Sequence, residues 1–157
     1  MPNPRFPWWS PQLGELEQTL VAEVLESRFL NDGEMTTRFE RELAAALGAK
    51  HVIGVSNGTS AMFLALASVG VGPGDEVLVP DVTFIATANA VSLAGATPVL
   101  VDVDPATLTL DPEAAARAVT PRTKAIVPVH VSGRSADLAA LRRLADARGL
   151  VLIEDAA

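Results

Sequence analysis

Short apolar runs alternate with segments of helical periodicity, and this pattern constrains the fold more than any other feature of the sequence. The runs cover residues 51–55, 76–79, 97–101, 124–129 and 150–153. Continuous apolar runs of this length are typical of parallel strands that are buried on both faces. The sequence therefore predicts an α/β fold with a mostly parallel sheet, helices on both faces and right-handed crossovers.

The intervening segments have the periodicity and the end residues of helices. Residues 15–28 and 35–47 repeat apolar positions on one side and are predicted to be amphipathic surface helices. Residues 60–69 are apolar all round and are predicted to form a buried helix. Residues 137–148 place Leu138, Leu141 and Ala145 on one face, and Asp111-Pro112-Glu113 has the residues typical of a helix start.

This alternation predicts one α/β domain over residues 15–157, preceded by an N-terminal arm at residues 1–14. The arm includes Trp8 and Trp9, which we expect either to lie across a partner subunit or to be disordered.

Composition excludes several classes of function. Acidic residues outnumber basic ones 19 to 12, and the basic residues are scattered, so nucleic acid is not an expected partner. The absence of cysteine excludes disulfides, thiolate nucleophiles and cysteine-based zinc sites. The sequence has neither a secretory leader nor a run of about twenty lipid-compatible residues, so we expect a cytoplasmic protein that does not use a membrane.

A polar step, Asn57-Gly58-Thr59-Ser60, separates the apolar run at 51–55 from the apolar segment that follows. Backbone N–H groups in the first turn of a helix have no partner within the helix and attract anions. Gly58 permits close approach, and the hydroxyls of Thr59 and Ser60 can add hydrogen bonds, so a phosphate group fits this position. The alternative is that Asn57 or Ser60 only caps the helix.

Further polar and aromatic residues follow other predicted strands. Phe84 lies just beyond the run at 76–79, His130 follows the run at 124–129, and Asp155 ends the last run. Ligands of open α/β sheets bind beyond the carboxyl ends of the strands. A phosphate site, an aromatic ring and a carboxylate at this edge suit a phosphorylated aromatic cofactor, with the ring stacked on Phe84 and Asp155 paired with a ring nitrogen.

Each of these residues also has a structural alternative. Asp155 could cap the segment that follows its strand, and Phe84 could be a core aromatic in an apolar helix. A structurally satisfied role is favoured for His130. Asp102 and Asp104 do not indicate a metal site, because Asp104-Pro105 is typical of a turn and no third ligand is near in sequence.

Several segments together resemble the DegT/DnrJ/EryC1/StrS family of pyridoxal-phosphate sugar aminotransferases, which have fold type I. The segments are S-N-G-T-S, G-P-G-D-E-V, T-F-x-A-T-A-N-A, T-K-A-I-x-P-V-H and E-D-A-A, in this order from residue 56 to residue 157. The resemblance extends over nearly the whole chain from about residue 15. Ser132 and Arg134 depart from the family pattern, which bears on substrate contacts and not on the cofactor site.

The resemblance implies specific roles. Gly58, Thr59 and Ser60 would hold the phosphate of pyridoxal 5'-phosphate, Phe84 would stack on its ring, and Asp155 would be the catalytic residue that binds the ring nitrogen. A carboxylate there keeps the nitrogen protonated, and the protonated ring stabilises the carbanion that forms when the substrate loses a proton.

The family moves an amino group, usually from glutamate, to a keto group of a nucleotide-linked sugar, and its active sites are shared between two subunits of a homodimer. A nucleotide-sugar dehydratase of the same family is an alternative.

The resemblance also implies that the family's Schiff-base lysine follows the E-D-A-A segment, after which this sequence ends. Lys50 and Lys124 are not expected to substitute, because each precedes or begins a predicted strand and should face away from the cofactor edge. The chain is therefore interpreted as the N-terminal part of the large domain of such an enzyme, inactive by itself. A non-catalytic fragment or interaction module is the remaining alternative.

Overall fold

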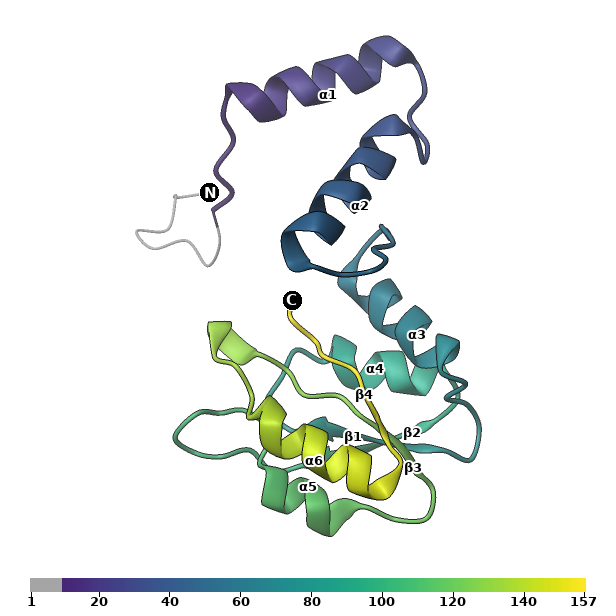
Figure 1. Ribbon diagram of the computed structural model, residues 1–157, viewed down its shortest axis with the longest axis vertical. Coiled ribbons are helices and arrows are strands. Elements are labelled where there is room, and N and C mark those ends of the chain that lie inside the picture. The colour runs from purple at the N-terminus through teal and green to yellow at the C-terminus, as the bar shows by residue number, and fades with distance from the viewer. Residues whose placement is uncertain (1–9) are drawn as a thin grey trace, which may run out of the picture. The chain divides into compact units, whose positions relative to one another are not determined.

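The computed structural model describes residues 10–157, which fall into two compact units, the first ending at Gly54 and the second running from Val55 to Ala157. The chain runs from the first unit, at the purple end of the colour scale, into the second (Figure 1). Most of the predicted N-terminal arm at residues 1–14, with Trp8 and Trp9, lies outside the described residues. Among the residues that are described, none of the helices has the length and apolar character needed to cross a bilayer.

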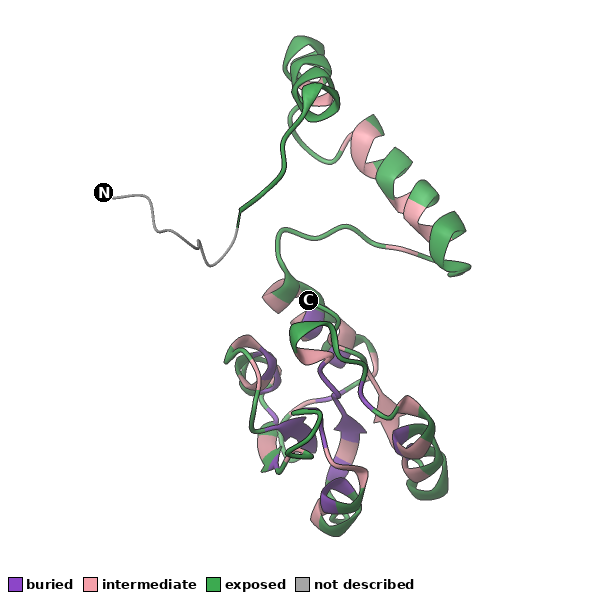
Figure 2. Cartoon of the chain, turned by 90° about the vertical axis from the view of Figure 1, so that its left-hand side faces the viewer, coloured by how far each residue is buried: buried purple, intermediate pink, exposed green. Residues whose placement is uncertain are grey.

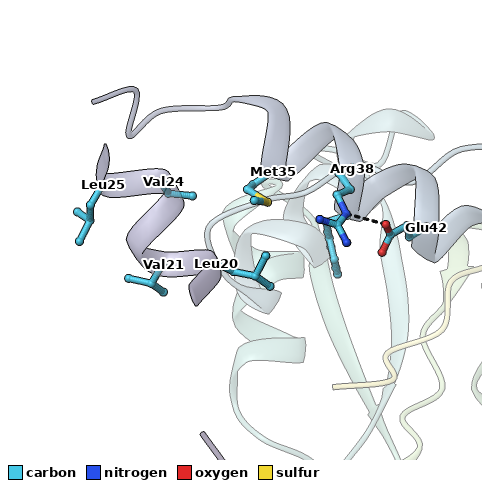
Figure 3. Close-up of a pocket in the computed structure, with 8 residues that line it drawn as sticks. Leu20, Val21, Val24, Leu25, Met35, Arg38 and Glu42 are labelled. Atoms are coloured by element: carbon cyan, nitrogen blue, oxygen red, sulfur yellow. Dashed lines mark hydrogen bonds and ion pairs between the residues drawn. The ribbon is translucent and has the colours of Figure 1, made fainter. Parts of the chain in front are cut away.

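The first unit contains two amphipathic helices, α1 (Glu15–Ser27) and α2 (Glu34–Leu47), which agree closely with the prediction. No residue of either helix is buried (Figure 2). Their apolar side chains instead line a groove of about 440 Å³, with the Arg38–Glu42 ion pair at its side (Figure 3). The groove is formed within the first unit and contains none of the predicted site residues. Its lining residues are Leu20, Val21, Val24, Leu25, Met35, Arg38, Phe39 and Glu42.

The second unit is built on a four-stranded parallel sheet with the strand order β2-β1-β3-β4 (Figure 1). In chain order its elements are α3 (Gly58–Ser68), β1 (Glu76–Pro80), α4 (Ala86–Leu93), β2 (Thr97–Val101), α5 (Pro112–Ala118), β3 (Thr123–Ile126), the 3-10 turn η1 (Val131–Gly133), α6 (Leu138–Arg148) and β4 (Val151–Leu152). The α/β fold class predicted from the alternation of apolar runs and helices is confirmed.

The sheet is covered on both faces by helices. Alternate side chains of β1 point to opposite faces: Val77 and Val79 pack in a core with residues of α3 and α4, whereas Leu78 packs with residues of α5 and α6. All three side chains are fully buried. This double coverage explains why the strand sequences are continuously apolar rather than alternating.

The prediction of a strand at residues 51–55 is wrong. These residues form no ladder with any described strand, and Ile53 is 78% exposed. The segment crosses the boundary between the two units, and the Gly54 N–H donates a hydrogen bond to the Glu40 carboxylate at 2.6 Å. An apolar, β-branched run can become a strand only where a neighbouring strand accepts and donates its backbone hydrogen bonds, and local sequence does not reveal that neighbour.

Complete burial of the helix at residues 60–69 was also predicted, and this is only partly right. In α3, Met62 and Leu66 are buried, but Leu64 is 48% exposed. The helix packs one face toward the sheet and α4 and leaves the other face uncovered by the described residues of its unit. The apolar character of every side of this helix therefore led to an overestimate of how many of its side chains are buried.

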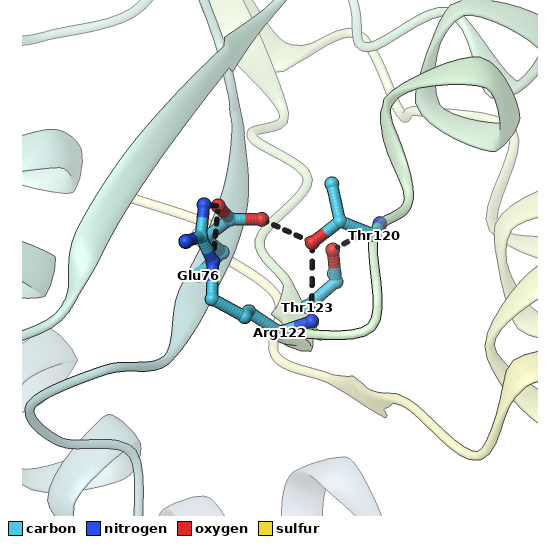
Figure 4. A network of polar contacts seen from close by, with 4 residues as sticks. All are labelled: Glu76, Thr120, Arg122 and Thr123. Atoms are coloured by element: carbon cyan, nitrogen blue, oxygen red, sulfur yellow. Dashed lines mark hydrogen bonds and ion pairs between the residues drawn. The ribbon is translucent and has the colours of Figure 1, made fainter.

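A polar network at the amino ends of β1 and β3 fixes the edge of the sheet opposite the predicted site. Glu76 is 5% exposed, and its carboxylate accepts hydrogen bonds from the Thr120 hydroxyl and the Arg122 guanidinium (Figure 4). The Glu76 backbone N–H also donates to the Arg122 carbonyl at 2.9 Å. The Thr120 hydroxyl, followed by the Arg122 guanidinium, holds the pKa of Glu76 below its ordinary value of 4.5. This network joins the loop before β3 to the start of β1, where the pairing of the two strands is irregular.

Candidate cofactor site

The predicted site residues lie after the carboxyl ends of β1 and β4 and at the amino end of α3, all within the second unit. Asp155 is held by backbone hydrogen bonds to the strand segment at 128–130, the Phe84 loop by one to the start of α4, and the start of α3 by its own N-cap. The arrangement is therefore determined by the fold of the second unit alone.

At the start of α3, Asn57 acts as the N-cap. Its side-chain oxygen accepts the Ser60 N–H at 2.9 Å, and its carbonyl accepts the Ala61 N–H at 3.1 Å. The capping interpretation is thus confirmed for Asn57. The N–H groups of Gly58 and Thr59 have no acceptor among the described residues. These two amides, together with the hydroxyls of Thr59 and Ser60, are therefore the donors that this helix end can offer to an anion.

Asp155 continues the β3–β4 pairing after both strands end. Its N–H donates to the Pro128 carbonyl at 2.9 Å, and its own carbonyl accepts the His130 N–H at 3.0 Å. Pro128 has no N–H to donate, so the ladder is interrupted there and resumes as the isolated pairing of Val129 with Asp155. The backbone of Asp155 is therefore fixed at the carboxyl edge of the sheet.

The two carboxylate oxygens of Asp155 have different partners. Oδ1 accepts the Ala157 N–H at 3.2 Å, which is the local capping contact considered as an alternative. Oδ2 accepts a hydrogen bond from the Thr87 hydroxyl in α4, at 2.9 Å. The second contact joins segments that are far apart in the sequence, so a local capping role does not account for all of the geometry.

Phe84 lies in the loop before α4 and is 78% exposed. The structural alternative considered for Phe84, a core aromatic in an apolar helix, is therefore wrong. The loop is tied to α4 by the Thr87 N–H, which donates to the Phe84 carbonyl at 3.2 Å. An exposed ring on a tethered backbone can stack on a planar ligand, which a buried ring could not do.

The structure brings these three predicted elements together through short contacts. Thr87 contacts the carboxylate of Asp155 and the backbone of Phe84. Two residues after Asp155, the Cβ of Ala157 lies 3.9 Å from the position that a Cβ would occupy at Gly58. The carboxylate, the aromatic loop and the free end of α3 are therefore close neighbours at one edge of the sheet.

His130 is satisfied by its surroundings, as the sequence favoured. Its Nδ1 accepts the Ala136 N–H at 3.1 Å, and its Nε2 lies 3.2 Å from a Glu154 carboxylate oxygen. Since Nδ1 is an acceptor, this pattern assigns the ring proton to Nε2, which donates to Glu154. The ring holds the turn η1, where Ser132 has a left-handed φ of 52°, against the residue that precedes Asp155.

Lys124 lies at the edge opposite the site, as predicted. Its Nζ donates to the Gly70 carbonyl at 2.7 Å and lies 3.4 Å from Asp75, in the turn that precedes β1. Asp104 opens a turn, also as predicted, with its carboxylate accepting the Ala106 N–H at 2.6 Å. Within residues 10–157, no group of three potential metal-ligating side chains was found.

Sequence analysis missed Thr87 as a site residue. It is the second threonine of T-F-x-A-T-A-N-A, and a threonine in a helix indicates no particular function by itself. Its partner lies 68 residues further along the chain, so the contact is visible only in the folded structure.

Known proteins with similar sequences include the spore coat polysaccharide biosynthesis protein SpsC of Bacillus subtilis, which is 48% identical over 99% of this chain and 40% of its own length. The solved structure of 3-amino-5-hydroxybenzoic acid synthase is 49% identical, with a TM-score of 0.91 over 98% of this chain and 40% of its own. The structure of NtdA from Bacillus subtilis with bound cofactor PMP is 38% identical, with a TM-score of 0.85 over 88% of this chain and 32% of its own.

The chain thus spans about 40% or less of the length of these relatives. Residues 11–157 match the model of the DegT/DnrJ/EryC1/StrS aminotransferase family, whose cofactor is pyridoxal phosphate. The match includes every residue of the site described above. The chain belongs to the DegT/DnrJ/EryC1/StrS aminotransferase family.

Proposed function

We propose that this chain forms the N-terminal part of the cofactor-binding domain of a pyridoxal-phosphate-dependent aminotransferase. The observation that carries the proposal is the Asp155 carboxylate, which lies next to the Phe84 loop and close to the uncapped amides of α3. A carboxylate, an exposed ring and an anion-binding helix end are the three groups that a phosphorylated pyridine requires.

Each residue has a defined task in this proposal. The N–H groups of Gly58 and Thr59 and the hydroxyls of Thr59 and Ser60 bind the phosphate, since the Ser60 N–H is already used by Asn57. Phe84 stacks on the ring and excludes water from one of its faces. Asp155 holds a proton on the ring nitrogen by placing a negative charge beside it. When bound, the cofactor supplies a protonated pyridine that withdraws electrons from the substrate.

For the substrates, we propose glutamate as the amino donor and a keto group of a nucleotide-linked sugar as the acceptor, with the site completed in a homodimer. These finer assignments rest on the family resemblance. A non-sugar acceptor is the competing possibility, because a relative of 49% identity is named as a synthase of 3-amino-5-hydroxybenzoic acid, whereas the relative of 48% identity is named for polysaccharide biosynthesis.

Binding of pyridoxamine 5'-phosphate tests the cofactor site directly, since this form of the cofactor needs no covalent bond to a lysine. We expect the chain to bind it, as measured by quenching of cofactor fluorescence. Asp155→Asn should weaken binding by roughly tenfold to a hundredfold, because a hydrogen bond with a charged partner is lost. Asp137→Asn is the matched control, since Asp137 caps α6 and Asn caps equally well. Failure of the unchanged chain to bind, or equal binding by Asp155→Asn, would refute the proposal.

The acceptor is tested with a protein of the relatives' full length. Glutamate-dependent amination of a nucleotide-linked keto sugar, followed as release of 2-oxoglutarate, is the expected result. Reaction with a cyclic keto acid in preference to the sugar would identify the competing class of substrate.

A further inference from the structure

Thr87 is a buried residue, and the packing around it does not by itself explain why its side chain carries a hydroxyl. It is the second residue of α4 and is 1% exposed. Valine has nearly the same shape and would fill the same space without a polar atom. A buried hydroxyl is tolerated only when it is hydrogen-bonded, so the contacts of the Thr87 oxygen indicate why threonine stands there.

The Thr87 oxygen lies between two polar partners. It is 2.9 Å from Oδ2 of Asp155 and 3.1 Å from the hydroxyl oxygen of Thr83. A carboxylate can only accept, so the single Thr87 proton must point to Asp155. The Thr83 hydroxyl must then donate to Thr87. The three groups form a directed chain of hydrogen bonds from Thr83 through Thr87 to Asp155.

This chain of hydrogen bonds determines the orientation of the Asp155 carboxylate. Thr87 holds Oδ2 from α4, and the Ala157 N–H holds Oδ1 from the other side. With one donor on each oxygen, the carboxylate plane cannot turn freely. Donation by Thr83 polarises the Thr87 hydroxyl and so strengthens its bond to Asp155.

We propose that Thr83 and Thr87 form a hydroxyl relay that orients the Asp155 carboxylate toward the ring nitrogen of the cofactor. This inference rests on the proposed function of the site. Thr87 is a positioning residue, since it acts on the cofactor through Asp155. A carboxylate held in this orientation places its negative charge beside the ring nitrogen, so the relay favours the state in which that nitrogen carries a proton.

The test uses pyridoxamine 5'-phosphate labelled with ¹⁵N in the ring and bound to the 157-residue chain. The ¹⁵N chemical shift reports whether the ring nitrogen is protonated. In Thr87→Val, we expect the shift to move toward that of an unprotonated pyridine and the affinity to fall about tenfold. Thr87→Ser keeps the hydroxyl and should restore both values. Thr83→Val should move the shift in the same direction by less.

Thr109→Val is the matched control. Thr109 is also buried, at 4% exposure, but its hydroxyl pairs with Thr107 in the loop after β2. This variant loses a buried hydroxyl and should leave the ¹⁵N shift unchanged.

Two failures can be told apart. If the unchanged chain does not bind the cofactor, the proposed function is overturned and the inference with it. If the chain binds with a protonated ring and neither Thr87→Val nor Thr83→Val moves the shift, the relay alone is overturned. A shift that moves equally in the Thr109→Val control would also overturn it, because a general loss of packing would then explain the effect. Should Thr87→Val not fold, Thr83→Val and Thr87→Ser still decide the result.

Discussion

Gly58 and Ala157, at the start of α3 and at the end of the sequence, lie side by side. A Cβ at Gly58 would be 3.9 Å from the Cβ of Ala157, which is an ordinary van der Waals distance. Gly58 also has no left-handed φ. Neither backbone conformation nor crowding by the described residues therefore requires glycine at this position, and a ligand that must approach the backbone is the reason that the proposed function supplies.

Gly58→Ala is expected to separate stability from binding. Alanine is a better helix former than glycine, so the free energy of unfolding should stay the same or rise by up to about 1 kcal/mol in urea denaturation. The added methyl group would stand where the phosphate approaches, so the affinity for pyridoxamine 5'-phosphate should fall about tenfold or more. Unchanged affinity would show that the phosphate does not use this helix end.

Replacement of Asn57 tests the cap and the anion site together. Asn57→Ala removes the acceptor of the Ser60 N–H and should cost about 1 kcal/mol of unfolding free energy. Asn57→Asp keeps the cap and should retain the stability, but it adds a negative charge beside the proposed phosphate. Cofactor binding should therefore be weaker in Asn57→Asp at nearly unchanged stability. Equal binding by Asn57→Asp and the unchanged chain would contradict a phosphate at this position.

The lowered pKa of Glu76 predicts a contribution to stability that depends on pH. A carboxylate whose folded-state pKa is below its ordinary value stabilises the fold at neutral pH, and this contribution is lost as the pH falls from 4.5 through the folded-state pKa. Glu76→Gln should therefore unfold at lower urea concentration than the unchanged chain at pH 7, and the difference should shrink below pH 4.5.

An exposed ion pair provides the control for Glu76. Asp146→Asn removes a pair in which Asp146 lies 3.9 Å from Arg142 on the surface of α6. Exposed pairs of this kind contribute little, so the change should be below about 0.5 kcal/mol at either pH. A Glu76→Gln difference that persisted undiminished at low pH would argue against an ionic origin.

His130 is expected to support the turn next to Asp155 without taking part in the chemistry. His130→Phe leaves the Ala136 N–H without its acceptor and should cost about 1 kcal/mol of unfolding free energy. Hydrogen exchange of the Ala136 amide should become faster. Glu154→Gln keeps an acceptor for the Nε2–H group, so it should leave both measurements nearly unchanged. Unaltered exchange at Ala136 in His130→Phe would show that the ring does not hold this turn.

Local sequence was sufficient to predict those helices and strands whose apolar periodicity and end residues indicate the same element. The run at 97–101 became β2, Asp111 and Pro112 start α5, and the segment at 137–148 became α6. These features depend on side-chain periodicity and on backbone conformations that neighbouring residues dictate. Local sequence also predicted correctly that Asn57-Gly58-Thr59-Ser60 lies at the start of α3.

Tertiary structure decided the features that depend on distant partners. The run at 51–55 has the composition of a strand but lacks a described neighbour, and Phe84 is apolar but exposed. Both outcomes depend on which segments pack against these residues, and a window of sequence does not contain that information.

The site itself shows the same division. Apart from the strand expected at 51–55, the sequence predicted the strands in their correct order, and it marked Gly58, Phe84 and Asp155 as candidate site residues, because these features follow from short-range patterns and motifs. Only the folded sheet decided that the carboxylate of Asp155 meets the hydroxyl of Thr87. The physical reason is that hydrogen bonds between segments 68 residues apart form only after parallel strands have been brought into register by the packing of helices on both faces.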